Sequence, residues 1–260
     1  MSDTAIIFTK KDHIGYITLN FPDEGNMLTG EMAQELDAIG KQINRDSDIY
    51  VVILTGAGGV FCAGSELEKM AERAGAAAAL KAGAETCGAS RAIAGINQPV
   101  IAAINGEALG AGLELVLACD IRLAGEKARF GLPQVTLGLV PTEGGTQRLP
   151  RLVGRGKALE MLLTGEIMDA ATALETGLVH RVVADDKLAA EAEAMAKAIT
   201  TRAPVALKFV KEAINKGLDL TAEQGLRLEA DLYFLLHTTA DRTEGINAYL
   251  QKRPPDFKGR

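Results

Sequence analysis

Residues 104–114 have the sequence Ile-Asn-Gly-Glu-Ala-Leu-Gly-Ala-Gly-Leu-Glu and continue an apolar run that begins at Pro99. The apolar run predicts a buried strand, and the small residues after it predict a tight turn that opens a helix. A helix that starts in this way directs free backbone N–H groups at one point, and Glu114 falls in its first turns. Such N–H groups are suited to stabilising an oxyanion, so this segment is predicted to line a reactive site.

Strand-like and helix-like segments alternate over most of the chain, which predicts an α/β fold. Three similar strand-to-helix units are consistent with a repeated ββα plan. A hairpin is expected from two short β-favouring runs, at 6–9 and 14–19. Apolar residues at helical spacing predict a helix from about Glu31. Buried strands are expected at 51–55, 99–104 and 121–124, and helices at 75–80 and from 156.

The last part of the chain is predicted to be helical, with segments at 187–200, 205–215 and 221–239. We place a boundary near residue 200, which divides the chain into a core of residues 1–200 and a helical region of residues 201–260. The final helix carries many apolar side chains: Leu226, Leu228, Leu232, Tyr233, Phe234, Leu235 and Leu236. A helix this apolar is expected to pack on the core or on another subunit.

The composition is that of a globular chain, with 260 residues and 47% hydrophobic content. The net charge of −6 argues against a general nucleic-acid or membrane surface. A cytoplasmic location is expected, because the sequence has no basic leader followed by an apolar segment and no long apolar run. The three cysteines, Cys62, Cys87 and Cys119, lack metal or redox spacing and are predicted to be buried free thiols.

Two other kinds of site are not favoured by the residues. The turn Thr55-Gly-Ala-Gly-Gly59 follows a strand, but it lacks the third glycine and the helix of a dinucleotide-binding motif, so we interpret it as structural. The histidines His13, His180 and His237 are scattered and have no matched nucleophile. No metal site is expected.

Several ordered motifs resemble the enoyl-CoA hydratase/isomerase family, the crotonase superfamily, over nearly the whole length. They are Asn20-Phe-Pro22, Asn26-Met-Leu28, residues 61–67 (Phe-Cys-Ala-Gly-Ser-Glu-Leu), residues 104–114, Phe130-Gly-Leu-Pro-Gln134, residues 141–149 (Pro-Thr-Glu-Gly-Gly-Thr-Gln-Arg-Leu), Leu163-Thr-Gly165 and Gly177-Leu-Val179. The resemblance implies a spiral of ββα units followed by a helical region that mediates trimers, commonly paired into hexamers. It also implies an acyl-CoA substrate and no cofactor, since coenzyme A is part of the substrate.

By the same resemblance, the backbone N–H groups of Ser65 and Ala111 form the oxyanion hole for the thioester carbonyl. Ala111 replaces the usual glycine, which keeps the donor but adds a Cβ beside the hole. Ala63, Ser65 and Leu67 are implied to lie along the coenzyme A. Glu66 stands where an aspartate is frequent in the family.

The family's hydratases use two glutamates, one to activate water and one to deliver a proton to the α-carbon. Glu114 matches the first of them. Gln134 occupies the position of the second, and an amide does not exchange protons near neutral pH. Glu143 matches a position where the family's dienoyl-CoA isomerases carry an acid. Our hypothesis is that Glu114 and Glu143 form the acid/base pair and that Gln134 orients water or substrate.

Three functions follow from this site. The favoured one is an enoyl-CoA hydratase, which adds water to an α,β-unsaturated acyl-CoA. The second is a dienoyl-CoA hydratase, including one for cyclic substrates, or an enoyl-CoA isomerase, because the acid has moved from position 134 to position 143. The third is a catalytically silent acyl-CoA-binding protein, which the changes at Gln134 and Ala111 leave open.

Overall fold

The computed structural model describes residues 4–65 and 88–260. The helix expected at 75–80 and the positions Glu66, Leu67 and Cys87 lie outside the described residues. Within the described ranges, no helix is both long enough and apolar enough to cross a membrane.

The main sheet has six strands in the order β1-β2-β3-β4-β6-β9. Strands β1 and β2 form the antiparallel hairpin predicted from the sequence, and the remaining neighbours pair in parallel. The strands are β1 (Ile6–Lys11), β2 (Ile14–Leu19), β3 (Val51–Gly56), β4 (Val100–Ile104), β6 (Ile121–Gly125) and β9 (Arg181–Val183). A second sheet has the order β5-β7-β8, with β5 (Glu107–Leu109), β7 (Arg129–Gly131) and β8 (Met168–Asp169).

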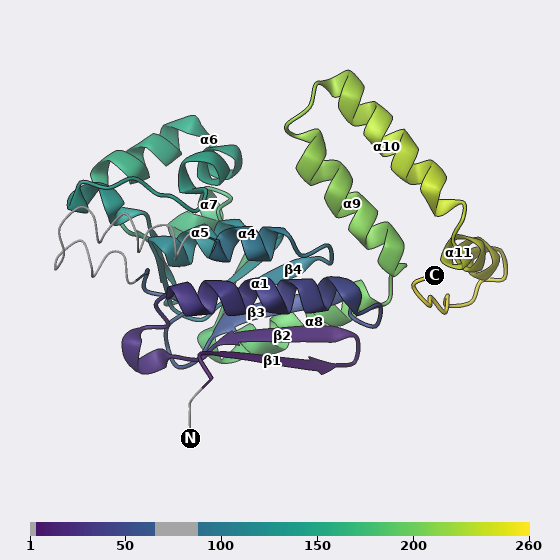
Figure 1. Cartoon of the computed structure of the whole chain (residues 1–260), viewed down its shortest axis with the longest axis horizontal. Helices are drawn as coiled ribbons and strands as arrows, with labels where there is room; N and C mark the ends of the chain where they lie inside the picture. Colours follow the sequence, from purple (N-terminus) through teal and green to yellow (C-terminus); the bar gives the residue numbers. More distant parts are fainter. Residues whose placement is uncertain (1–3, 66–87) are drawn as a thin grey trace.

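Alternation along the central strands supplies apolar side chains to both faces of the main sheet. Val52 and Leu54 belong to the larger core, which also holds buried residues of α1, α4 and α5. Val51 and Ile53 belong to a smaller core completed by α8. The helices between the strands are α1 (Gly30–Arg45), α4 (Ala89–Ala94), α5 (Ala111–Leu117), α6 (Gly145–Thr164) and α7 (Ala170–Glu175). Helix α8 (Leu188–Thr200) follows the last strand, and Figure 1 shows α1 running alongside β2.

Helix α1 shows why the periodicity in the sequence was informative. The side chain of Thr29 accepts a hydrogen bond from the backbone N–H of Met32 and caps the helix. The predicted apolar stripe is buried on one face, with Met32, Leu36, Ile39 and Ile43 inside the core. The helix and the strands expected at 51–55, 99–104 and 121–124 are confirmed.

Two helices differ from the sequence prediction. The helix predicted from Gly156 is present as the second part of α6, but α6 already begins at Gly145, and its unpredicted first part ends at a kink where Gly154 has a non-helical φ of 77°. Helix α11 (Ala240–Leu250) was not predicted, since it has only two buried residues and no clear apolar stripe. The C-terminal Arg260 carbonyl instead accepts hydrogen bonds from the N–H groups of Ala240 and Asp241, at 2.8 and 3.2 Å.

Helices α9 (Pro204–Gly217) and α10 (Ala222–Leu236) pair as a hairpin that stands apart from the sheet (Figure 1). Only one residue of α10, Leu232, is buried. Leu226 and Phe234 are 67% and 66% exposed. The sequence predicted that this helix packs on the core or on another subunit. The core covers little of its apolar surface.

Candidate active site

The loop at residues 56–65 is held from one side by the segment around Asn26. Asn26 is fully buried, and its side-chain amide donates to the carbonyls of Ala57 and Val60 at 2.9 and 2.8 Å. The Ala63 N–H donates to the Gly25 carbonyl, and the Leu28 N–H donates to the Gly64 carbonyl, both at 2.9 Å. These bonds fix the backbone that leads to Ser65.

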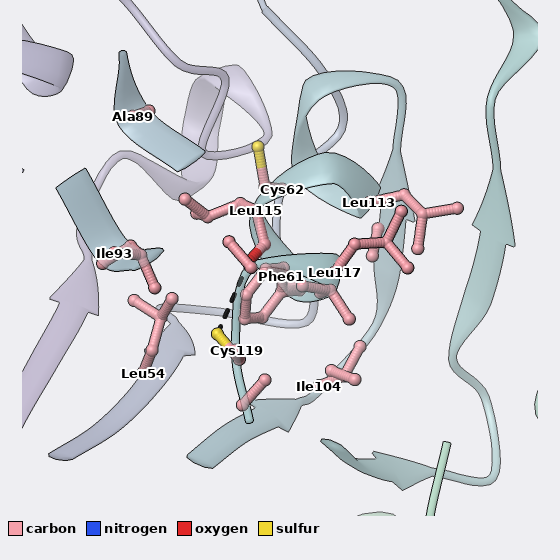
Figure 2. Close-up of a cluster of buried hydrophobic side chains, with 14 of the residues drawn as sticks. Leu54, Phe61, Cys62, Ala89, Ile93, Ile104, Leu113, Leu115, Leu117 and Cys119 are labelled. Atoms are coloured by element: carbon pink, nitrogen blue, oxygen red, sulfur yellow. Dashed lines mark hydrogen bonds between the residues drawn. The ribbon is translucent and has the colours of Figure 1, made fainter. Parts of the chain in front are cut away.

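A second set of contacts brings the same loop to the start of α5. Cys62 forms a parallel bridge with Ala108, and the Leu109 N–H donates to the Cys62 carbonyl at 3.0 Å. A Cβ on Gly112 would collide with that carbonyl, so only glycine permits this approach. Figure 2 shows Cys62 and Phe61 next to the leucines of α5. The loop and the helix therefore pack as one rigid unit.

The two backbone groups expected to form an oxyanion hole, those of Ser65 and Ala111, lie on this unit. Both residues are buried, and Ala111 is the first residue of α5, after Gly110 with φ of 52°. The first N–H groups of a helix have no partner within it. In the part of the chain that the structure describes, neither the Ser65 N–H nor the Ala111 N–H donates a hydrogen bond. Ala111 is not among the residues with positive φ, so alanine is accommodated there without backbone strain.

Glu114 lies one turn into α5 and is 1% exposed. Its Oε1 atom accepts hydrogen bonds from the backbone N–H groups of Glu143 and Gly145, each at 2.7 Å. Gly145 is the first residue of α6, so the carboxylate also lies at the positive end of that helix. Both interactions direct partial positive charge at the carboxylate and fix its orientation.

Glu143 contacts Glu114 through its backbone, while its own carboxylate reaches the start of α4. Its Oε1 accepts from the Gly88 N–H, and its Oε2 accepts from the Ser90 N–H at 3.0 Å. The structure thus brings residues 114 and 143 together and also ties the 141–145 turn to α4. The half-buried Glu143 is not the solvated loop carboxylate that its sequence context alone would indicate.

Gln134 lies in the short 3₁₀ helix η2 (Pro133–Leu137) and is 5% exposed. Among the described residues, its Oε1 has no hydrogen-bond partner. A buried polar atom without a partner costs about 1–3 kcal/mol, so a donor from water or from a ligand is favoured at this position. The Oγ atom of Ser90 is buried and without a partner in the same way.

The remaining predictions concern the coenzyme A contacts, the cysteines and metal binding. Ala63 lies in the loop beside Ser65, whereas Leu67 is outside the described residues. Cys62 and Cys119 are buried as predicted, Cys119 is a free thiol, and burial raises the pKa of the Cys119 thiol to about 12. The Cys119 thiol only donates to the Leu115 carbonyl, as the dashed line in Figure 2 shows. Among the described residues, no group of histidine, cysteine and acidic side chains is arranged to hold a metal.

Three residues of the site had been given no role from the sequence. Gly88 and Ser90 carry no local pattern that would identify them as partners of Glu143. Arg148 belongs to the 141–149 motif, and its Nη1 donates to the Glu143 carbonyl at 2.7 Å. The only feature of the sequence that could have pointed to Arg148 was its position within that motif.

Solved structures define the class of protein. The fold matches enoyl-CoA hydratase from Bacillus anthracis with a TM-score of 0.94 and 40% identity, covering 99% of this chain and 100% of that one. The expected crotonase-type α/β fold with a C-terminal helical region is therefore confirmed.

Sequence comparisons then specify the family. The family model for enoyl-CoA hydratase/isomerase matches residues 9–260. The 2,3-dehydroadipyl-CoA hydratase of Escherichia coli K12 is 41% identical over 99% of this chain and 100% of that protein. The short-chain-enoyl-CoA hydratase of Clostridium acetobutylicum is 38% identical over 98% of each chain. The chain belongs to the enoyl-CoA hydratase/isomerase family, within the crotonase superfamily.

Proposed function

We propose that this protein is an enoyl-CoA hydratase, a hydro-lyase that adds water across the double bond of an α,β-unsaturated acyl-CoA. The observation that carries the proposal is the buried carboxylate of Glu114, which lies on the helix that begins at Ala111 and accepts hydrogen bonds from the backbone N–H groups of Glu143 and Gly145. Family membership and the names of the full-length relatives support the same reaction.

In the proposed mechanism, Glu114 takes a proton from water as the water oxygen bonds to the β-carbon. The electron pair of the double bond moves toward the thioester, and the carbonyl oxygen gains negative charge. The N–H groups of Ser65 and Ala111 stabilise that oxygen, each by roughly 3 kcal/mol in a site that excludes water. Glu143, in its protonated form, delivers a proton to the α-carbon, and the enolate returns to a thioester. Release of the proton from Glu114 to solvent and uptake of one by Glu143 restore both groups for the next turnover.

Gln134 orients the attacking water in this mechanism. Its buried Oε1 has no partner in the described structure, so it is able to accept a hydrogen bond from water or from the substrate. Ala63, Ser65 and Leu67 line the coenzyme A in the proposal. No redox cofactor is required, because the reaction adds water without a change in oxidation state.

A second candidate function has a specific observation in its favour. Gln134 cannot supply a proton, and the second carboxylate comes from Glu143 in a different turn. Such a displaced acid suits a carbon farther from the thioester, as in a linear or cyclic dienoyl-CoA hydratase or an enoyl-CoA isomerase. A silent acyl-CoA-binding protein is the third candidate, and the retained Glu114 and Glu143 speak against it.

The proposal extends to assembly and location. We infer a homotrimer or homohexamer formed through the helical region of residues 201–260, whose apolar side chains are largely exposed. Those over half exposed are Val210, Ile214, Leu218, Leu226, Tyr233, Phe234, Leu235, Tyr249 and Leu250. This many exposed large apolar side chains on one region favours contact with another chain. The cytoplasmic location expected from the sequence belongs to the same proposal.

The test is a substrate panel with purified protein. It contains crotonyl-CoA, longer 2-enoyl-CoAs, and linear and cyclic dienoyl-CoAs, with hydrated and isomerised products separated by mass and retention. Rapid hydration of simple enoyl-CoAs supports the hydratase. Conversion of dienoyl substrates alone supports the second candidate. Binding of the thioesters without any conversion supports the silent binding protein.

A further inference from the structure

We propose that Arg148 is a positioning residue that orients the Glu114 carboxylate by holding the backbone of residues 143–145. This inference rests on the proposed function, because it gives Glu114 a part in the reaction. Arg148 itself has no place in the proposed chemistry, and it reaches Glu114 only through the turn.

The hydrogen bonds of the turn divide into two opposite sets. On one side, the N–H groups of Glu143 and Gly145 both donate to Oε1 of Glu114 at 2.7 Å. On the other side, Arg148 binds the two carbonyls between them. Its Nη1 donates to the Glu143 carbonyl, and its backbone N–H donates to the Gly144 carbonyl, each at 2.7 Å.

This arrangement fixes the direction of the N–H groups. The Gly144 carbonyl and the Gly145 N–H belong to one planar peptide unit, so holding the carbonyl aims the N–H at Glu114. The Glu143 N–H and carbonyl lie on either side of a single residue, so bonds at both restrict its two backbone angles. Arg148 and Glu114 therefore bind residues 143–145 from opposite sides, Arg148 at the carbonyls and Glu114 at the N–H groups.

The packing over Gly144 supports a built contact rather than a chance one. Gly144 has φ of 108°, and a Cβ at this position would collide with the Arg148 guanidinium. The half-buried guanidinium therefore lies directly against the turn. Gly144 caps α6 without a side-chain hydrogen bond, so the cap depends on other groups for its shape.

The experiment compares Arg148→Met, which removes the donor and keeps the length, with Arg148→Lys, which keeps one donor. Arg151→Met is the matched control. The Arg151 Nη1 likewise donates to a backbone carbonyl, that of Gln147, at 2.7 Å. Gln147 lies outside residues 143–145, whose N–H groups bind Glu114. Turnover is measured on the best substrate of the panel, and amide hydrogen exchange is followed at residues 143 and 145.

In Arg148→Met, we expect kcat to fall by about 10- to 100-fold with little change in KM, because the general base is displaced while thioester binding is kept. Arg148→Lys should recover part of the loss. Exchange at residue 143 should become faster in Arg148→Met, whereas the backbone bond from residue 148 to the Gly144 carbonyl remains and should keep exchange at Gly145 close to that of the wild type. Arg151→Met should stay within about twofold of the wild type.

Wild-type kcat and unchanged exchange in Arg148→Met would overturn the inference, as would an equal loss in Arg151→Met. If Arg148→Met does not fold, Arg148→Lys decides, since wild-type exchange and rate with its shorter side chain would also contradict the positioning role. Failure of the proposed function has a different signature. Wild-type protein would then convert no thioester, or Glu114→Gln would keep full turnover, while hydrogen exchange still reports whether Arg148 holds the turn.

Discussion

The backbone N–H of Glu143 donates a 2.7 Å hydrogen bond to Oε1 of Glu114, so the two proposed catalytic glutamates meet through one main-chain group. The Glu143 carboxylate accepts from the N–H groups of Gly88 and Ser90 instead. Substitution of the Glu143 side chain therefore leaves its bond to Glu114 in place. The two glutamates can be tested separately, although they are in contact.

Glu114→Gln should lower kcat by about 10²- to 10⁴-fold, because an amide cannot accept the proton of water. The fold should be retained, since the amide oxygen can still accept from the N–H groups of Glu143 and Gly145. Steady-state hydration is the measurement. Glu107→Gln, at an exposed position of β5, is the control and should behave like wild type. Turnover of Glu114→Gln close to that of the control would rule out Glu114 as the base.

Glu143→Gln should lower hydration by about 10²-fold, because it removes the proposed proton donor. The amide oxygen still provides one acceptor for the start of α4, so the effect on the melting temperature should be modest. Exchange of solvent deuterium into the α-carbon of the substrate separates proton delivery from water activation. A Glu143→Gln variant with full activity would show that the carboxylate serves only to anchor Gly88 and Ser90.

Gln134→Glu should increase hydration of simple enoyl-CoAs, because a protonated carboxyl at this position can deliver a proton to the α-carbon. It should also destabilise the protein at neutral pH by about 1–3 kcal/mol, since burial raises the pKa of an unpaired carboxyl. The cost is absent below the unfolded-state pKa of about 4.3 and grows as pH rises above it. Urea unfolding at pH 4 and pH 7 measures this difference. An equal cost at both values would contradict it.

Lys211→Met should lower the free energy of unfolding by about 3 kcal/mol, because it leaves a charge without its partner. The Lys211 Nζ lies 2.6 Å from Oδ2 of Asp120, and the two side chains are 9% and 21% exposed. Lys216→Met is the control on the same helix. Its ion pair with Glu212 is largely exposed and should contribute under about 0.5 kcal/mol. Equal losses in denaturant titrations of the two variants would show that burial of the Lys211 pair has no effect.

Glu244 should make stability depend on pH at the C-terminal end of the chain. Its carboxylate accepts from the Arg253 guanidinium at 2.6 and 2.9 Å and from the Asp256 N–H at 2.9 Å, and chiefly these bonds, that of Arg253 first, lower its pKa from 4.5 to about 2. A lowered folded-state pKa adds stability above the unfolded-state value and loses it as pH falls toward the folded-state value. The stability difference between wild type and Glu244→Gln should therefore be constant above about 4.5 and shrink between about 4.5 and about 2. A difference that does not change with pH would contradict this assignment.

Local patterns were sufficient for much of the fold. The β1–β2 hairpin, the central strands and α1 follow from the period of apolar residues, because one buried face imposes that period on neighbouring residues. The part of α6 after Gly154 was predicted, whereas the part that begins at Gly145 was missed, since its glycines and Pro150 interrupt the helical pattern. Helix α11 was missed, because contacts with the chain terminus rather than an apolar stripe hold it.

The sequence by itself determined the α/β class, the family, and the residues to examine at 65, 111, 114, 134 and 143, since these depend on short motifs and their order. Tertiary structure alone decided what those residues touch. The bonds from Glu143 to Glu114, from Gly88 and Ser90 to Glu143, and from Arg148 to the turn are made as separate elements pack together. Of these contacts, the sequence predicted only that Glu114 and Glu143 lie close together, as an acid/base pair. Hydrogen-bond direction depends on how peptide planes and helix ends are oriented after packing, and no local sequence pattern encodes that orientation.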